Sequence, residues 1–208
     1  NESLMLVVSI VSGAILTGQN MSFKKIIIGL LLSLLLGSGL AVAADFGKGL
    51  EAYNSGDFKT ALSEWTPIAE QGDASTQFNL GVMYESGIGV PKNDKTAAKW
   101  YTLAAEQGHA KAQYNMGVFY EYGRVVLAND RTAVEWYNLA AKQGHALAQG
   151  NLGVMYFNGE GVLTDTKRAY MWFNLGGYNG DELAGENKDK IAKNMTPADI
   201  SKAQDMSS

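Results

Sequence analysis

Few side chains in this sequence could do chemistry. The 208 residues contain no cysteine and two histidines, His109 and His145. Without cysteine the chain cannot form a thiolate metal site, a disulfide or a cysteine nucleophile. Each histidine follows a glycine, which is typical of a turn. We therefore expect no metal site, no cofactor and no catalytic residue.

Two short motifs imitate known signatures in the wrong context. Gly47–Ala52 has the glycine spacing of a dinucleotide fingerprint, but no strand precedes it. Ser22-Phe-Lys-Lys25 matches the Ser-x-x-Lys of β-lactamases but lies in a segment that we expect to be removed at export. The acidic residues are scattered, and none repeats at a spacing that would pair an acid with a base. These motifs carry no prediction of catalysis.

The net charge argues against two classes of partner. Lys and Arg number 17 against 21 for Asp and Glu, which gives −4 at pH 7. A basic footprint for nucleic acid or for anionic lipid is therefore missing. We expect no nucleic-acid partner, and no membrane partner after the leader described next is removed.

The N-terminal region has the layout of a secretory signal peptide. Lys24 and Lys25 precede the apolar stretch Ile26–Leu36, and Ala41-Val42-Ala43 supplies small residues at a cleavage site. We predict a signal peptide over 21–43, cleaved after Ala43, and a periplasmic or secreted protein. Residues 1–20 fit no element, and we expect them to be a non-native upstream extension.

The remainder of the chain repeats every 36 residues. Several residue classes keep this interval, and agreement of so many classes is the signature of a solenoid. The repeated residues are Gly81, Gly117 and Gly153; Tyr84, Tyr120 and Tyr156; Trp100, Trp136 and Trp172; and Gly108, Gly144 and Gly180. The sequence predicts an all-α solenoid of helix–turn–helix repeats, with repeats over 74–109, 110–145 and 146–181.

Each repeat predicts two helices. In the first repeat, apolar positions at helical spacing predict a helix over 74–86, and Gly87–Pro91 breaks it. Asn93 or Asp94 can cap a second helix, which ends at Gly108. Glycine inside a helix costs about 1 kcal/mol against alanine, so Gly81 predicts a close approach to a neighbouring helix.

The ends of the array predict capping elements. Residues 44–73 hold a half-matched repeat, with a short first helix and turn over 52–58 and a second helix over 61–71. Residues 182–208 form capping helices and a tail, and Thr196 followed by Pro197 predicts a last helix over 198–206.

One loop departs from the pattern. Val125 stands where the neighbouring loops carry Gly89 and Gly161, and a β-branched residue tolerates positive φ poorly. We therefore expect this loop to take a different path. Arg124 beside it either makes a contact or reflects drift of the loop sequence.

The repeat unit resembles the Sel1-like repeat, a longer relative of the tetratricopeptide repeat. The resemblance rests on Ala-x-Ala-Gln-x-Asn-Leu/Met-Gly-Val-x-Tyr, on the loop glycines and on Trp-Tyr-x-x-Ala-Ala-x-Gln-Gly-His, over about residues 74–181. It implies a right-handed superhelix of helix pairs that serves as an adaptor for other proteins, and many bacterial members are exported. It also implies that the first helices line a concave surface.

On those first helices one face remains after the core stripe is assigned. Its Asn amides could hydrogen-bond an extended peptide, and its Met and Phe side chains could supply apolar contact. The alternative is that Val and Met pack against the next repeat while Asn bonds locally. The candidate partner-binding residues are Asn79, Met83, Asn115, Phe119, Tyr122, Asn151 and Met155.

The predicted function is that of an exported scaffold or adaptor that binds a segment of another protein, whose identity the sequence leaves open. An alternative is a regulator or inhibitor subunit of an envelope enzyme. A further alternative is a β-lactamase-like hydrolase, because some cysteine-rich relatives have carried that label. The absence of cysteine and of a nucleophile motif gives the last alternative no chemical support.

Overall fold

A computed structural model describes residues 44–206 of the chain. The expected extension over 1–20, the expected signal peptide over 21–43 and the Ser22–Lys25 motif lie outside the described residues. Every described helix belongs to one compact unit, Asp45–Ser208. No helix among those described has the length and apolarity needed to cross a membrane.

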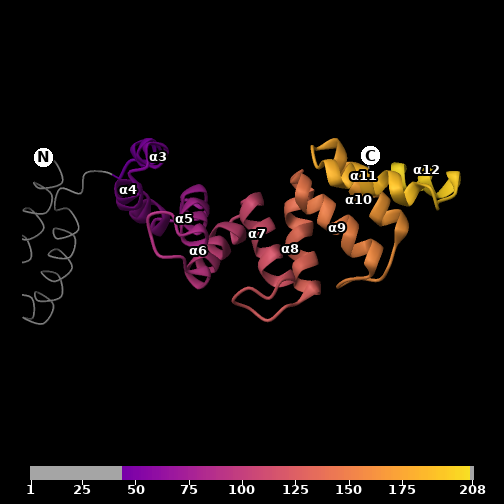
Figure 1. The fold of residues 1–208 in the computed structure, drawn as a ribbon, viewed down its shortest axis with the longest axis horizontal. Coiled ribbons are helices and arrows are strands. Elements are labelled where there is room, and N and C mark those ends of the chain that lie inside the picture. The colour runs from indigo at the N-terminus through magenta and orange to yellow at the C-terminus, as the bar shows by residue number, and fades with distance from the viewer. Residues whose placement is uncertain (1–43, 207–208) are drawn as a thin grey trace, which may run out of the picture. The chain divides into compact units, whose positions relative to one another are not determined.

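The described residues form ten α-helices and no strand, and the helices pack in chain order (Figure 1). The helices are α3 (Phe46–Ser55), α4 (Phe58–Glu70), α5 (Ala74–Ser86), α6 (Asp94–Glu106), α7 (Ala110–Glu121), α8 (Asp130–Lys142), α9 (Ala146–Asn158), α10 (Thr166–Tyr178), α11 (Glu182–Ala192) and α12 (Pro197–Asp205). This confirms the prediction of an all-α solenoid.

Capping residues begin and end the helices where the sequence predicts. Asn93 caps α6 by accepting a hydrogen bond from the Thr96 amide at 3.0 Å, and Thr196 caps α12. Gly108 follows α6 with a φ of 92°, a left-handed conformation that favours glycine. The predicted boundaries of these helices are therefore confirmed within a residue or two.

The glycine inside each first helix marks a close helix contact. A Cβ atom on Gly81 would lie 2.4 Å from Cε1 of Tyr101 in the second helix of the same repeat. Gly117 and Tyr137 repeat this contact in the second repeat. The close approach that the sequence predicts is confirmed, and its cause is an aromatic ring lying flat against the first helix.

The N-terminal pair is more complete than expected. The predicted first helix and turn over 52–58 are right in the helix end at Ser55 and in the turn at Gly56, but α3 begins earlier, at Phe46, and Phe58 already opens α4. A Cβ on Gly49 would lie 2.4 Å from the Trp65 ring, which is the same glycine–ring contact as in the repeats. The connection from Ser55 to Phe58 is shorter than the loops of the repeats, so Gly49 falls outside the 36-residue period.

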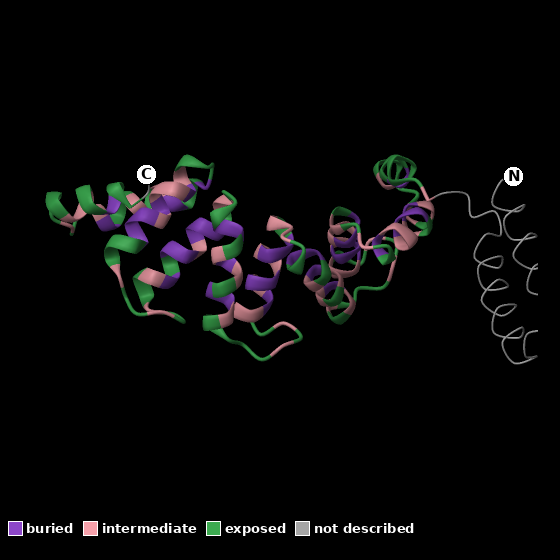
Figure 2. Cartoon of the chain, turned by 180° about the vertical axis from the view of Figure 1, so that it is seen from behind, coloured by how far each residue is buried: buried purple, intermediate pink, exposed green. Residues whose placement is uncertain are grey.

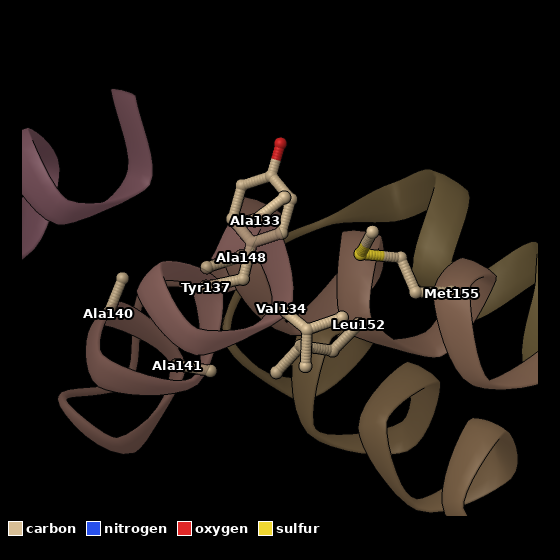
Figure 3. Close-up of a cluster of buried hydrophobic side chains, with 8 residues drawn as sticks. All are labelled: Ala133, Val134, Tyr137, Ala140, Ala141, Ala148, Leu152 and Met155. Carbon is tan, nitrogen blue, oxygen red and sulfur yellow. The ribbon is translucent and has the colours of Figure 1, made fainter. Parts of the chain in front are cut away.

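Each described helix carries buried residues, which are coloured purple in Figure 2, and the buried hydrophobic residues form clusters between neighbouring helices. Figure 3 shows one such cluster, in which Tyr137 and Val134 from α8 pack with Leu152 and Met155 from α9. The repeated tryptophans are half-buried, and Trp172 packs against this cluster from the following repeat. The last helix, α12, packs on α10, and both belong to the C-terminal cluster.

A buried glutamine links each repeat to the one before it. The Gln113 side-chain amide donates to the Ala105 carbonyl at 3.1 Å, and its oxygen accepts from Gln143 at 2.8 Å. Gln77 and Gln149 make the corresponding bonds. Because both ends of the amide are satisfied, these polar groups can be buried at little cost.

The loop with Val125 does not take a different path, so that prediction is wrong. Val125 has a φ of 69°, beside 70° at Gly89 and 68° at Gly161. Its loop also keeps the backbone bonds of its neighbours, since the Arg124 amide donates to the Phe119 carbonyl and the Asn129 amide to the Tyr120 carbonyl. These bonds hold the valine in a left-handed conformation that it would otherwise avoid.

Candidate functional site

Three of the predicted partner-binding side chains lie in the core. Met83 and Phe119 are 0% exposed and Met155 is 2% exposed. Phe119 packs edge-on against the Tyr101 ring, with 5.9 Å between ring centroids. We therefore correct the prediction for these residues, because side chains without exposed area cannot supply apolar contact to a partner.

Two of the predicted asparagines are engaged inside the protein. The Tyr101 hydroxyl donates to Oε2 of Glu85 at 2.6 Å, and the Asn115 side chain lies near the same hydroxyl. The Tyr137 hydroxyl likewise donates to Glu121 at 2.5 Å and meets Asn151. We call each such set a Glu–Tyr–Asn triad, and its asparagine comes from the following repeat.

The triads are locked in one protonation state. Burial raises the pKa of Tyr101 far above its usual value, and the neighbouring Glu85 carboxylate raises it further. The neighbouring Asn115 side chain opposes the shift, as expected for an amide that favours the charged form of the phenol. The hydroxyl is therefore a permanent donor to glutamate, which fits a structural role and not acid–base chemistry. Asn79 follows Trp65, which has no hydroxyl, and so has no triad.

Arg124 ties the loop of the second repeat to the first repeat. Its Nη1 lies 2.6 Å from Oε1 of Glu85, and its Nη2 lies 3.1 Å from Oδ2 of Asp94. Its guanidinium also lies 4.5 Å from the centroid of the Phe119 ring. Of the two interpretations of Arg124, the structure therefore shows a contact, and this contact lies within the chain.

The histidines cap helices. His109 and His145 stand at the N-caps of α7 and α9, and Nδ1 of each accepts from a backbone amide at 3.3 Å. The His109 ring stacks on Phe78 at 4.7 Å. Burial lowers the pKa of both imidazoles, and Lys111 lowers it further. Within residues 44–206, no group of three or more His, Cys, Asp or Glu side chains could hold a metal ion.

The third repeat replaces the triad with aromatic rings. Phe157 and Phe173 occupy the positions that hold Glu and Tyr in the first two repeats. The Phe173 ring keeps the place of the tyrosine rings, because a Cβ on Gly153 would lie 2.4 Å from its Cδ1. Phe157 is 45% exposed, and neither phenylalanine has a polar atom that could form the Tyr–Glu bond of the first two repeats.

A groove of about 630 Å³ opens at these two rings, between α9, α10 and α11. Phe173 and Ile191 are buried beneath it, and Val154 and Phe157 are partly exposed at its side. Its polar lining consists of Thr166, Asn187, Lys190 and Asn194. We call this the third-repeat groove, and its size suits a bulky apolar side chain with a few polar contacts at its rim.

The candidate site therefore differs from the one predicted. Of the predicted residues, Tyr122 is well exposed, at 68%, and none lines the third-repeat groove. The sequence does contain a signal for the groove, since positions 157 and 173 depart from the Glu and Tyr of the preceding repeats. This departure indicates a groove only once the structure shows that the Glu and Tyr side chains of the first two repeats hydrogen-bond to each other.

Comparison with known proteins agrees with this architecture. A family model described as the Sel1 repeat matches residues 74–109, 110–145 and 146–181. A Sel1 repeat protein from Oxalobacter formigenes is 35% identical, with a TM-score of 0.66 over 69% of this chain. The protein c5321, described as a protective antigen of uropathogenic Escherichia coli strains with an SLR fold, is 33% identical, with a TM-score of 0.65 over 69% of this chain.

These matches cover part of each relative. They span 59% of the Oxalobacter formigenes chain and 32% of the c5321 chain. No curated protein matches this chain.

Proposed function

The chain belongs to the Sel1 repeat family, and from that premise we propose that it is an exported module that binds a segment of another protein in the third-repeat groove. Sel1 repeats generally mediate protein–protein interaction. The observation that carries the proposal is the exchange of the Glu–Tyr pair for Phe157 and Phe173, which leaves a partly exposed apolar groove.

Differences between the repeats support the third-repeat groove as the binding surface. Residues that maintain the fold recur at each repeat, as the helix glycines and the buried glutamines do. Phe157 instead places a large apolar side chain at 45% exposure where two repeats carry a hydrogen-bonded carboxylate. An exposed apolar cluster with a polar rim is typical of an interaction site.

Export is proposed from the sequence of the leader. Lys24 and Lys25, the apolar run that follows them and the small residues up to Ala43 support cleavage by a signal peptidase. Mass spectrometry of the protein from fractionated cells tests this part. A species that begins at Ala44 outside the cytoplasm supports export, and an uncleaved chain retained in the cytoplasm contradicts it.

Photo-crosslinking in the native cell tests the binding part. A crosslinking amino acid replaces Phe157, and the control replaces Leu139 on α8, which is also 45% exposed and lies outside the groove lining. We expect a discrete protein adduct at position 157 that is absent at position 139. Adducts at 139 alone would contradict the groove as the binding surface, and an adduct with an envelope enzyme would favour the regulator alternative.

A further inference from the structure

The third-repeat groove contains an asparagine without its tyrosine. Asn187 follows Asn115 and Asn151 at the same 36-residue interval. Those two asparagines lie near the hydroxyls of Tyr101 and Tyr137 and favour their ionised form. Asn187 instead meets the groove above Phe173, which has no hydroxyl. Its amide N–H groups therefore have no tyrosine oxygen to bond.

A lysine lies beside this amide. Lys190 occupies the position that holds valine in the repeats, at Val82, Val118 and Val154. The lysine that replaces valine at this position lines the third-repeat groove. Its Nζ lies 3.5 Å from Oδ1 of Asn187 and 3.5 Å from Glu186. Both partners of the Glu186 pair are more than half exposed, and such pairs add little stability. The ammonium can therefore exchange this partner for another carboxylate at small cost.

No acidic residue lines the groove, although acidic residues outnumber basic ones in the chain. The groove thus offers an apolar floor, an amide donor and one cation. A ligand that complements all three has a bulky apolar side chain and a nearby carboxylate.

We propose that the third-repeat groove binds an internal acidic segment of a partner protein, with a bulky apolar side chain over Phe173 and a neighbouring Asp or Glu carboxylate at Asn187 and Lys190. This inference rests on the proposed function and specifies the partner's chemistry. In the first two repeats a carboxylate of the chain itself, that of Glu85 or Glu121, bonds to the tyrosine at the corresponding place.

An internal segment fits better than a chain terminus. A second hollow shares Thr166 and Asn194 with the groove, and its other lining residues are Thr164, Asp165, Lys167, Met195 and Asp199. A bound chain can therefore continue past the anchor along α10 and α12. A terminal carboxylate would end at the groove and leave this hollow without contacts.

Peptide binding to the purified full chain tests the proposal. The probes are fluorescein-labelled dodecapeptides of Gly, Ser and Asn with an amidated C-terminus, one central Trp, and one Glu placed one to four residues after it. We expect the best probe to lose at least about tenfold in affinity when Trp is replaced by Ala. Replacement of its Glu by Lys should weaken binding about fivefold.

Two protein variants locate the binding. The double variant F157E/F173Y restores the pair of the first two repeats and should weaken the best probe at least about tenfold. The variant K190E should reverse the preference, so that the Lys-containing probe binds better than the Glu-containing one. The matched control L139E should leave affinity unchanged, since Leu139 has the same exposure as Phe157 and lies outside the groove.

The outcomes separate this proposal from the proposed function. Equal binding of the Glu and Lys probes, or no response to K190E, overturns the acidic partner class. Tighter binding of a probe that carries only a free C-terminal carboxylate overturns the internal segment. If no probe binds while position 157 still crosslinks to a protein in cells, the groove function stands and the partner chemistry is wrong.

Discussion

A single hydroxyl group joins three helices at Tyr137. It donates to Glu121 on α7 at 2.5 Å and meets Asn151 on α9, while the ring packs over Gly117. A hydrogen bond to a charged group contributes more than a neutral one, about 1.5–3 kcal/mol. The triads therefore stabilise the contact between successive repeats as well as each helix pair.

We predict that Tyr137→Phe lowers the free energy of unfolding by about 1.5 kcal/mol, because it removes this bond and leaves the ring in place. Urea titration followed by circular dichroism measures the change. Tyr178→Phe is the control, because Tyr178 is 88% exposed. Equal stability of Y137F and the parent chain would contradict the structural role of the triad.

The capping histidines predict a pH dependence. Both imidazoles have a pKa below the unfolded value of about 6.5. The folded state therefore binds fewer protons than the unfolded state in the range below that value, and stability falls as the pH drops through it. Protonated Nδ1 also cannot accept the amide hydrogen bond that caps the helix.

We predict a loss of stability between pH 7 and pH 5.5 that is much smaller in the double variant H109D/H145D. Aspartate caps the equivalent helices α5 and α11 through Asp73 and Asp181, so the variant keeps a capping oxygen. Denaturant titrations at the two pH values measure the difference. An equal loss in both proteins would show that the histidines do not cause it.

Among the elements, the first helix of each repeat depends on its glycine. A Cβ on Gly117 would lie 2.4 Å from the Tyr137 ring, whereas a Cβ on Gly185 in α11 would lie 3.9 Å from its nearest neighbour, Cα of Gly177. Replacement of glycine by alanine would therefore cause a steric clash at position 117, whereas at position 185 it would only increase the helix propensity.

We predict that Gly117→Ala lowers the free energy of unfolding by about 2 kcal/mol, because the overlap with the ring outweighs the gain in helix propensity. Gly185→Ala should instead raise it by up to about 1 kcal/mol. Thermal and urea denaturation of the two variants test the pair. A stabilising G117A would mean that the ring does not lie against the helix.

The loop of the second repeat carries backbone strain at Val125, whose φ is 69°. A left-handed conformation costs an L-residue about 1–2 kcal/mol, part of which glycine loses again to its greater freedom in the unfolded chain. We predict that Val125→Gly raises the free energy of unfolding by about 0.5–1 kcal/mol. The control Val126→Gly has no positive φ to relieve and should give no gain.

At the scale of the whole molecule, most of the architecture could be predicted from the sequence. The helix pairs follow from the spacing of Gly81, Tyr101 and Gly108, because each class of residue repeats at the same interval. The N-terminal pair was only partly recognised, since its short loop moves Gly49 out of the period.

The candidate site was harder to predict. The periodicity of the sequence does not show which residues of a first helix face the neighbouring helix. The sequence therefore predicts Met83 and Phe119 on a surface, whereas both side chains are buried. The groove is lined by Phe157 and Phe173, which are 16 residues apart and lie on different helices. Only the fold shows that these two positions line one groove.

We propose that the third repeat lacks the Tyr–Glu hydrogen bond because it keeps a groove open for a partner. The free energy of unfolding of F157E/F173Y, which restores the pair of the first two repeats, tests this proposal. We predict that stability is kept or rises by about 1 kcal/mol, because function and not packing selects the two phenylalanines. A loss of more than about 1 kcal/mol would contradict it, because the two rings would then be packing that the fold itself requires.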